Sequence, residues 1–331
     1  MAVISIDLGG TKIAGALFED SGNVLAWETR LLEGRSGKDV SDLLGSMVTG
    51  LWDNPAARDG IEGIGICVPG IVYSKKGTVW APNIPGWVDF PLRRNLLEQL
   101  PEERRGIPVH IESDRTCYIL GEVWQGCAKG CDDAVYLAVG TGIGAGILID
   151  GHVLHGKGDS VGAAGWMALE PPYDRKYDGV GCFEYYASGN GIGARAREAV
   201  TAAAGYDGPL SAIPVESITA REVFSACFEG DPLALRIIDK AVLLWGMASA
   251  NLVSLFNPEK LIFGGGVFGP AVQLLPRIRE EALKWGQPIA MEEVEFCAST
   301  VSGGDAALMG AAWMVLRDLG KGKPSPQDGT F

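Results

Sequence analysis

The chain has 331 residues, of which 47% are hydrophobic, so it is long enough to form two lobes with substantial cores. Its formal net charge of −13 and the lack of a basic run argue against nucleic acid or an anionic membrane as a partner. Apolar runs have the length of strands, and the first residues lead directly into a strand. We therefore expect a cytoplasmic protein without a signal peptide or membrane span.

The first predicted strand, residues 3–6, ends at a glycine-rich turn that runs from Asp7 to Lys12 through Gly9, Gly10 and Thr11. A second strand follows at residues 13–18, so the turn closes a hairpin. Glycines let the backbone approach an anion, and successive N–H groups with a threonine hydroxyl can surround phosphate oxygens. The turn is therefore a candidate phosphate site.

The next stretch predicts a helix, two strands and a second helix. Apolar residues at helical spacing indicate a helix over 39–52, and a strand over 61–68 ends at Pro69-Gly70. A turn-rich segment containing Asn83 follows. A short strand at 109–112 then runs into Ser113-Asp114, after which 115–128 has a helical pattern. Asp114 therefore lies where a strand ends and a helix begins.

The hairpin pattern occurs a second time, about 130 residues further along. A strand at 136–139 leads into Gly140, Thr141, Gly142 and Gly144, and strand patterns at 145–149 and 153–154 follow. One such turn alone would be an ordinary hairpin more often than a ligand site. Neither turn is a Walker loop or a dinucleotide fingerprint, because each opens into a strand. The repetition favours a nucleotide site between two related halves.

Beyond the second hairpin, an irregular glycine- and proline-rich stretch covers 155–182, and such segments are usually functional. The remaining predicted elements are helices at 184–204, 216–229 and 233–256, a strand at 260–263, a helix at 270–286, a strand near 294–299 and a helix at 304–319. We expect an α/β protein with a ligand cleft between two lobes. The predicted domains are 1–115 plus 304–320, then 116–303, with a disordered tail at 321–331.

Taken in order, these motifs resemble the ROK family of bacterial sugar kinases and related repressors over residues 3–318. The segments that carry the resemblance are 7–12, Asp114, 140–146, 181–184, 257–259 and 264–266. The resemblance implies a two-lobed actin/hexokinase-like (ribonuclease H-like) α/β ATPase fold with an interlobe cleft. It also implies a homodimer and a sugar-like substrate.

The resemblance implies a role for each matching residue. Asp114 would be the catalytic base that accepts the proton of the sugar hydroxyl, and Asp7 would help to hold hydrated Mg²⁺. Asn83, Ser113 and Glu184 would contact the sugar. The residues implied for ATP and its phosphates are Asp7, Gly9, Gly10, Thr11, Lys12, Gly140, Thr141, Gly142, Gly144, Gly264, Gly265 and Gly266.

Each of these positions also has a purely structural explanation. Asp114 could cap the helix that it precedes, Asn83 could be a turn residue, and Glu184 could be an exposed helix start. Within the ordered motif set, we favour the catalytic role for Asp114.

The chain departs from the family pattern at several positions. Ser113-Asp114 stands where the family usually has Asn-Asp, and Trp-Met-Ala-Leu at 166–169 stands where it usually has Glu-Ile-Gly-His. Only Cys182 matches the three cysteines of the family zinc motif, and one thiolate cannot hold a tetrahedral zinc, so we predict no zinc site. Trp166 is either a core aromatic or a platform on which a sugar stacks. The acceptor is therefore left open.

The leading hypothesis is an ATP-dependent kinase of a sugar or sugar-like alcohol. The first alternative is a non-catalytic ligand sensor or pseudokinase on the same fold. A second is an ATPase that activates a partner enzyme through an iron–sulfur cluster, for which only Cys127 and Cys131 could be nominated. A DNA-binding repressor is disfavoured, because the first strand begins at Val3 and no helix-turn-helix precedes it.

Overall fold

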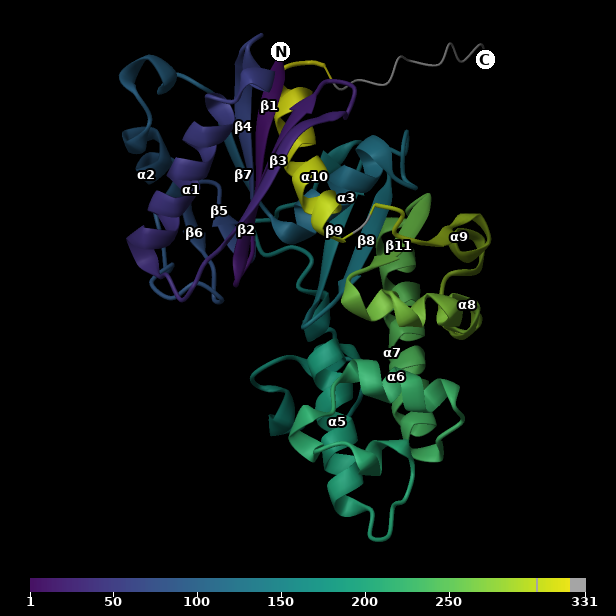
Figure 1. Ribbon diagram of the computed structural model, residues 1–331. Coiled ribbons are helices and arrows are strands. Elements are labelled where there is room, and N and C mark those ends of the chain that lie inside the picture. The colour runs from purple at the N-terminus through teal and green to yellow at the C-terminus, as the bar shows by residue number, and fades with distance from the viewer. Residues whose placement is uncertain (302, 322–331) are drawn as a thin grey trace. The chain divides into compact units, whose positions relative to one another are not determined.

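The computed structural model describes residues 1–301 and 303–321 (Figure 1). Contacts divide the chain into two units. Unit 1 comprises Met1–Gly130, His155–Val161 and the described residues from Thr300 onward, and unit 2 comprises Cys131–Leu154 and Gly162–Ser299. The domain boundaries expected from sequence stay a prediction. The predicted tail at 321–331 lies, apart from Lys321, outside the described residues.

Unit 1 contains a five-stranded sheet in the order β3-β2-β1-β4-β7. Its strands are β1 (Ala2–Leu8), β2 (Lys12–Glu19), β3 (Val24–Leu31), β4 (Ile61–Val68) and β7 (Val109–Ser113). β1 pairs with β2 in antiparallel fashion and with β4 in parallel, and β4 continues parallel to β7. The predicted strands of this half are therefore confirmed.

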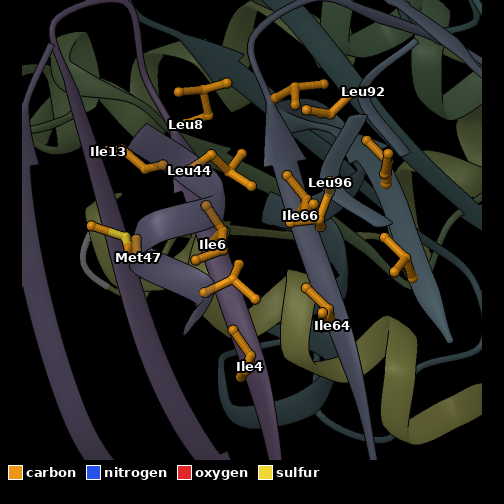
Figure 2. Packing of buried hydrophobic residues seen from close by; sticks show 14 of the residues in the cluster. Ile4, Ile6, Leu8, Ile13, Leu44, Met47, Ile64, Ile66, Leu92 and Leu96 are labelled. Carbon is orange, nitrogen blue, oxygen red and sulfur yellow. The ribbon is translucent and has the colours of Figure 1, made fainter. Parts of the chain in front are cut away.

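One face of this sheet is covered by α1 (Gly37–Trp52) and α2 (Leu92–Gln99). Side chains alternate along a strand, so Ile4, Ile6 and Leu8 of β1 all lie on this face. Figure 2 shows them packed with Ile64 and Ile66 of β4 among side chains from both helices, and full burial of each such side chain contributes about 1.5–3 kcal/mol. The helical spacing over 39–52 predicted α1, whereas α2 was not expected.

The other face of the sheet is covered by α3 (Asp114–Gln125) and α10 (Gly303–Asp318). A Cβ on Gly65 would lie 1.9 Å from the Ala311 carbonyl oxygen, so glycine at this position lets α10 lie directly on β4. The Ser5 hydroxyl of β1 donates to the Leu308 carbonyl of α10 at 2.6 Å. On its other side α10 lies against α3, because a Cβ on Gly310 would lie 1.8 Å from the Cys117 carbonyl oxygen, in the first turn of α3 that begins at Asp114.

The rest of unit 1 consists of short elements. β5 (Ile71–Tyr73) and β6 (Thr78–Trp80) form a separate antiparallel pair. Two 3₁₀ turns lie at Pro55–Ala57 and Glu102–Arg104. None of these segments was predicted as regular structure, because each is too short to show a periodic pattern.

Unit 2 contains a second five-stranded sheet in the order β10-β9-β8-β11-β12. Its strands are β8 (Ala134–Val139), β9 (Ile143–Ile149), β10 (His152–Val153), β11 (Lys260–Gly264) and β12 (Glu295–Ala298). Pairing again runs antiparallel from β8 to β9 and β10, and parallel from β8 to β11 and β12. The two sheets share one topology, which confirms that the hairpin and its turn are a repeated structural motif.

The helices of unit 2 are α4 (Cys182–Ala187), α5 (Gly189–Ala202), α6 (Ala220–Phe228), α7 (Pro232–Phe256), α8 (Leu275–Leu283) and α9 (Pro288–Glu293). The single helix expected at 184–204 is wrong: it breaks at Ser188, whose hydroxyl accepts from the Gly191 N–H at 2.9 Å and caps α5. The helix expected at 270–286 is a 3₁₀ segment, Pro270–Leu274, followed by α8.

The irregular stretch of unit 2 contains 3₁₀ turns at Ala164–Trp166 and Arg175–Tyr177, and further ones lie at Pro209–Ala212, Val215–Ser217 and Gly266–Phe268. Over the part of the chain that the structure describes, no helix combines the length and apolar character that crossing a membrane requires.

Candidate nucleotide and acceptor sites

The first glycine turn joins β1 to β2 in unit 1. The Gly9 N–H donates to the Lys12 carbonyl at 2.9 Å and closes the turn, while Gly10, Thr11 and Lys12 are exposed. A Cβ on Gly10 would lie 3.1 Å from the Cβ of Asn83, so the segment around Asn83 lies directly against the turn. The structure thus brings together two sequence-predicted parts of the site, the phosphate turn and the sugar-contacting asparagine.

Two acidic side chains lie at one edge of the sheet of unit 1. β1, β4 and β7 are parallel, so their carboxyl ends meet at that edge, where ligand sites of parallel sheets usually form. Asp7 pairs across β1 and β4 with Cys67, and Asp114 follows directly on β7. Both carboxyl groups are half-buried.

Burial raises the pKa of the Asp7 carboxyl to about 6; a hydrogen bond with the Cys67 thiol lowers it, the charge of Asp114 raises it, and Lys12 lowers it. Burial likewise raises the pKa of Asp114, against the charge and the backbone N–H of Arg115, which donates to Asp114 Oδ1 at 2.8 Å. The charge of Asp114 therefore acts electrostatically on Asp7. Raised values move a carboxyl toward the proton affinity that a general base needs near neutral pH.

Ser113, and not Asp114, caps α3. The Ser113 hydroxyl accepts from the Thr116 N–H at 3.4 Å and donates to the Thr116 hydroxyl at 3.2 Å. Asp114 is the first residue inside the helix, so its interpretation as the cap is wrong. Because the Ser113 hydroxyl is engaged as a cap, its expected contact with the sugar stays a prediction.

The second glycine turn joins β8 to β9 in unit 2 and is held by Glu184 of α4. The Gly140 N–H donates to the Gly142 carbonyl at 2.9 Å, and Glu184 Oε2 accepts from the Ile143 N–H at 2.7 Å. Burial raises the pKa of Glu184, while the Ile143 N–H lowers it. Glu184 is thus a half-buried support of the turn, not the exposed helix start of the alternative interpretation. Its contact with a sugar stays a prediction.

A cavity of about 750 Å³ opens in unit 2 beside the second turn. Gly140 and Thr141 line it, together with Gly266, Phe224 and Phe228. The remaining lining residues are Gly189, Asn190, Thr219, Ala220, Arg221, Ser225, Val267 and Pro270. Aromatic walls beside a glycine turn suit a flat base followed by phosphates.

Of the three glycines expected at the adenosine, Gly266 lines this cavity and a Cβ there would meet open space. A Cβ on Gly264 would lie 1.8 Å from the Tyr136 hydroxyl oxygen. Gly265 has φ +88°, and its Cβ would lie 2.5 Å from the Val139 carbonyl oxygen. These two glycines let the end of β11 and the residue after it approach β8 closely, and their contact with adenosine stays a prediction.

Sequence reasoning missed the two helix starts that line the cavity. At the start of α5, the Gly189 N–H donates to the Gly140 carbonyl at 2.8 Å and thereby ties the helix to the turn. α6 begins after Thr219, its N-cap, which forms a capping box with Glu222. The capping box could have been recognised in the sequence as a helix start. The position of α6 beside the second turn could not have been recognised, because the two are some 80 residues apart and no local pattern records tertiary proximity.

Trp166 does not fill the core, because 57% of its surface is exposed, so that interpretation is wrong. All seven cysteines are thiols. Among the residues that the structure describes, no three histidine, cysteine or acidic side chains gather as a metal-ligand group. The lack of a zinc site stays a prediction.

A sequence model of the ROK family matches residues 3–318. A glucokinase of Halalkalibacterium halodurans is 32% identical over 320 residues, covering 94% of each protein. A putative xylose repressor of a Caldicellulosiruptor species is 30% identical over 96% of this chain and 78% of the repressor. The crystal structure of a ROK family glucokinase from Streptomyces griseus with glucose and AMPPNP is similar with a TM-score of 0.72, at 29% identity over 95% of this chain and 99% of that one. The predicted actin/hexokinase-like α/β fold is confirmed.

Proposed function

Because this chain belongs to the ROK family, we propose that it transfers the γ-phosphoryl group of ATP to a hydroxyl of a sugar or sugar-like alcohol. Similarity to a glucokinase, and to a glucokinase structure that holds glucose and an ATP analogue, supports this role. The observation that carries the proposal is the cavity of unit 2, which places an apolar pocket of nucleotide size against the turn Gly140–Thr141.

Unit 2 supplies the nucleotide site in this proposal. The base and ribose occupy the cavity between Phe224 and Gly266, and the phosphates extend toward the N–H groups of the turn at Thr141. The turn of unit 1, with Thr11 and Lys12, binds phosphate oxygens in the same way. Positioning and charge neutralisation are the main requirements of phosphoryl transfer, and backbone N–H groups meet them without a basic patch.

Unit 1 supplies the base. As the acceptor oxygen attacks the γ-phosphorus, its proton passes to Asp114, the bond from phosphorus to the bridging oxygen breaks, and ADP leaves. Burial holds the pKa of Asp114 above its ordinary value, which improves its affinity for that proton. Asn83 and Glu184 are proposed to orient the acceptor through its hydroxyls.

The half-buried Asp7 carboxylate fits a hydrated divalent cation, because hard oxygen donors suit Mg²⁺ and a cation there would offset the cost of burying the negative charge. Bound there with ATP, Mg²⁺ would neutralise phosphate charge. Asp7 itself would orient the water ligands of the ion.

Three secondary expectations belong to the same proposal. A kinase that uses ATP and carries seven thiols fits the cytoplasm. A homodimer follows from the family, and sedimentation would measure it. Stoichiometric zinc in metal analysis of chelator-washed protein would contradict the predicted lack of a zinc site.

The experiment that tests the proposal measures ADP release with Mg²⁺–ATP and a panel of hexoses, amino sugars, acylated amino sugars and polyols. We expect release that depends on one class of acceptor and yields a phosphorylated product detectable by mass. Nucleotide binding without turnover on any acceptor would favour a ligand sensor. ADP release that no acceptor changes would favour an ATPase.

A further inference from the structure

A second cavity of unit 2, of about 500 Å³, is assigned no ligand by the proposed mechanism. Two exposed aromatic side chains border it, Trp166 at 57% and Tyr173 at 73% exposure, while Tyr177 at 7% and Cys182 at 6% form its buried part. Its volume lies in the range of small-molecule sites, roughly 300–1,000 Å³. Large aromatic surfaces left in water beside a cavity of this size indicate a ligand with an apolar face.

The walls of this aromatic pocket are held firmly. The Tyr177 ring packs edge-on against Tyr185, with ring centres 5.5 Å apart, and its hydroxyl lies 3.2 Å from that of Tyr186. Lys176 lies over the same three rings, 5.1 Å from the centre of Tyr177. The pocket is therefore organised before a ligand arrives.

A glycine keeps the two sides of the pocket together. Gly181 has φ +80°, and a Cβ there would lie 2.7 Å from the Trp166 Cα and 2.5 Å from the Gly165 carbonyl oxygen. A side chain at this position would push the segment that carries Trp166 away from the start of α4. The backbone is thus shaped to bring Trp166 beside Cys182 and Tyr177.

Polar groups of the pocket suit hydroxyls. Glu170 forms an ion pair with Lys240, and Asp178 accepts a hydrogen bond from the Tyr173 hydroxyl. An ionised carboxylate has about four acceptor positions on its two oxygens, so each retains capacity for a ligand hydroxyl. A sugar ring offers both an apolar C–H face for an indole and hydroxyls for carboxylates.

The pocket lies next to the proposed acceptor residue of the same unit. Gly165 immediately precedes Trp166, and a Cβ on Gly165 would lie 2.8 Å from Glu184 Oε2. That same oxygen accepts from the Ile143 N–H of the second turn. Trp166, which lines the pocket, is therefore adjacent in sequence to the residue that packs against Glu184 within unit 2.

We propose that this pocket binds a second sugar ring, so that the acceptor is a disaccharide or related glycoside in preference to a free hexose. That such a sugar is phosphorylated rests on the proposed function, whereas binding of the second ring in the pocket does not. The second ring stacks on Trp166, and its hydroxyls donate to Glu170 and Asp178. Ring stacking on one wall and hydroxyl recognition by carboxylates on the other are what distinguish a saccharide from a purely apolar group.

The first experiment compares maltose, cellobiose, lactose and diacetylchitobiose with their monosaccharides as acceptors. We expect kcat/KM to be at least about 10-fold higher for one disaccharide than for its monosaccharides. Trp166→Ala should lower kcat/KM for the disaccharide more than for its monosaccharides, and Trp166→Phe should restore part of the difference. Trp285→Ala is the matched control, because Trp285 is 58% exposed and does not line the pocket.

The second experiment measures binding of the same sugars by calorimetry without nucleotide, and so separates the pocket from the reaction. If no sugar is phosphorylated but a disaccharide binds about 10-fold more weakly to Trp166→Ala, the proposed function fails and the pocket stands. Tyr173→Ala, which truncates the other exposed aromatic side chain of the pocket, should weaken binding in the same direction.

Three outcomes would overturn the inference. The first is that no disaccharide binds more tightly than its monosaccharides. In the second, Trp166→Ala weakens monosaccharides and disaccharides equally. The third is that aryl glycosides bind more tightly than any disaccharide, which would assign the pocket to an apolar substituent. Thermal melting of each variant checks that it is folded, and the exposure of Trp166 predicts little loss of stability.

Discussion

The two sheets repeat one topology, yet their glycine turns have different chemical surroundings. In unit 1 the turn follows Asp7, and Asp114 begins the helix that follows β7 of the same sheet, so charged groups lie at this edge. In unit 2, Ala138 occupies the position equivalent to Asp7, because Ala138 pairs with Gly144 as Asp7 pairs with Ala14. The second turn therefore lacks this carboxylate and borders an aromatic cavity instead. The duplicated backbone provides two places for phosphate, while the side chains divide the chemistry: acid and base groups in unit 1, nucleotide binding in unit 2.

The largest expected effect tests whether unit 1 alone supplies the base. Asp114→Asn removes the proton acceptor and should lower kcat about 10²–10⁴-fold, the usual contribution of general base catalysis. Nucleotide affinity, measured by calorimetry, should stay within about twofold, because the cavity lies in unit 2. Asp39→Asn is the matched control, since Asp39 is also acidic in a helix first turn but is exposed. Full turnover in Asp114→Asn would remove this residue from the mechanism.

The second test fills the cavity of unit 2. A Cβ on Gly266 meets no atom within 4 Å, so Gly266→Leu should project into the cavity without disturbing the fold. We expect KM for ATP to rise at least about 10-fold with an unchanged melting temperature. Gly106→Leu, another glycine with open space around it but in unit 1, is the control. An unchanged KM in Gly266→Leu would show that ATP binds elsewhere.

The third test uses the charge of Asp7. Its pKa is raised from 3.8 to about 6, so the folded state binds the proton more tightly than the unfolded state does. The stabilisation that protonated Asp7 gives the folded state is therefore lost as pH rises through 6. Asp7→Asn cannot ionise and should be more stable than the original chain at pH 8 by about 1–3 kcal/mol, allowing for partial solvent screening.

Near pH 4 the stability difference between Asp7→Asn and the original chain should shrink toward zero, because both side chains are then largely neutral. Urea unfolding at the two pH values measures the difference. The variant should nonetheless lose Mg²⁺-dependent turnover. A gain in stability that does not change with pH would contradict burial of the charge as its cause.

The smallest expected effect separates capping from substrate contact at Ser113. Ser113→Ala removes the acceptor for the Thr116 N–H and should lower the free energy of unfolding by about 1 kcal/mol. KM for the acceptor, measured on the same variant, reports any direct sugar contact. An unchanged free energy of unfolding would show that the hydroxyl does not stabilise α3.

The glycine turns, most strands and the long helices could be predicted from local pattern, because each depends on residues close together in the chain. The break at Ser188 was missed because apolar residues continue on both sides of it, and only its cap shows that α5 starts anew. α2 was missed although Leu92 and Leu96 have helical spacing, because its 8 residues are fewer than the window over which periodicity is recognised. The half-buried state of Asp114, by contrast, depends on helices and strands from distant parts of unit 1.

By itself, the order of residues determined the two turns, the acidic position 114 at a strand end and the family, since strand period, glycine and short motifs are local properties. Tertiary structure decided that the starts of α5 and α6 line the cavity beside Gly140, and that Trp166 faces a second pocket. It also raised the pKa of Asp7 through burial and the neighbouring charge of Asp114. These properties depend on which distant side chains come within a few ångströms, and only packing sets that distance.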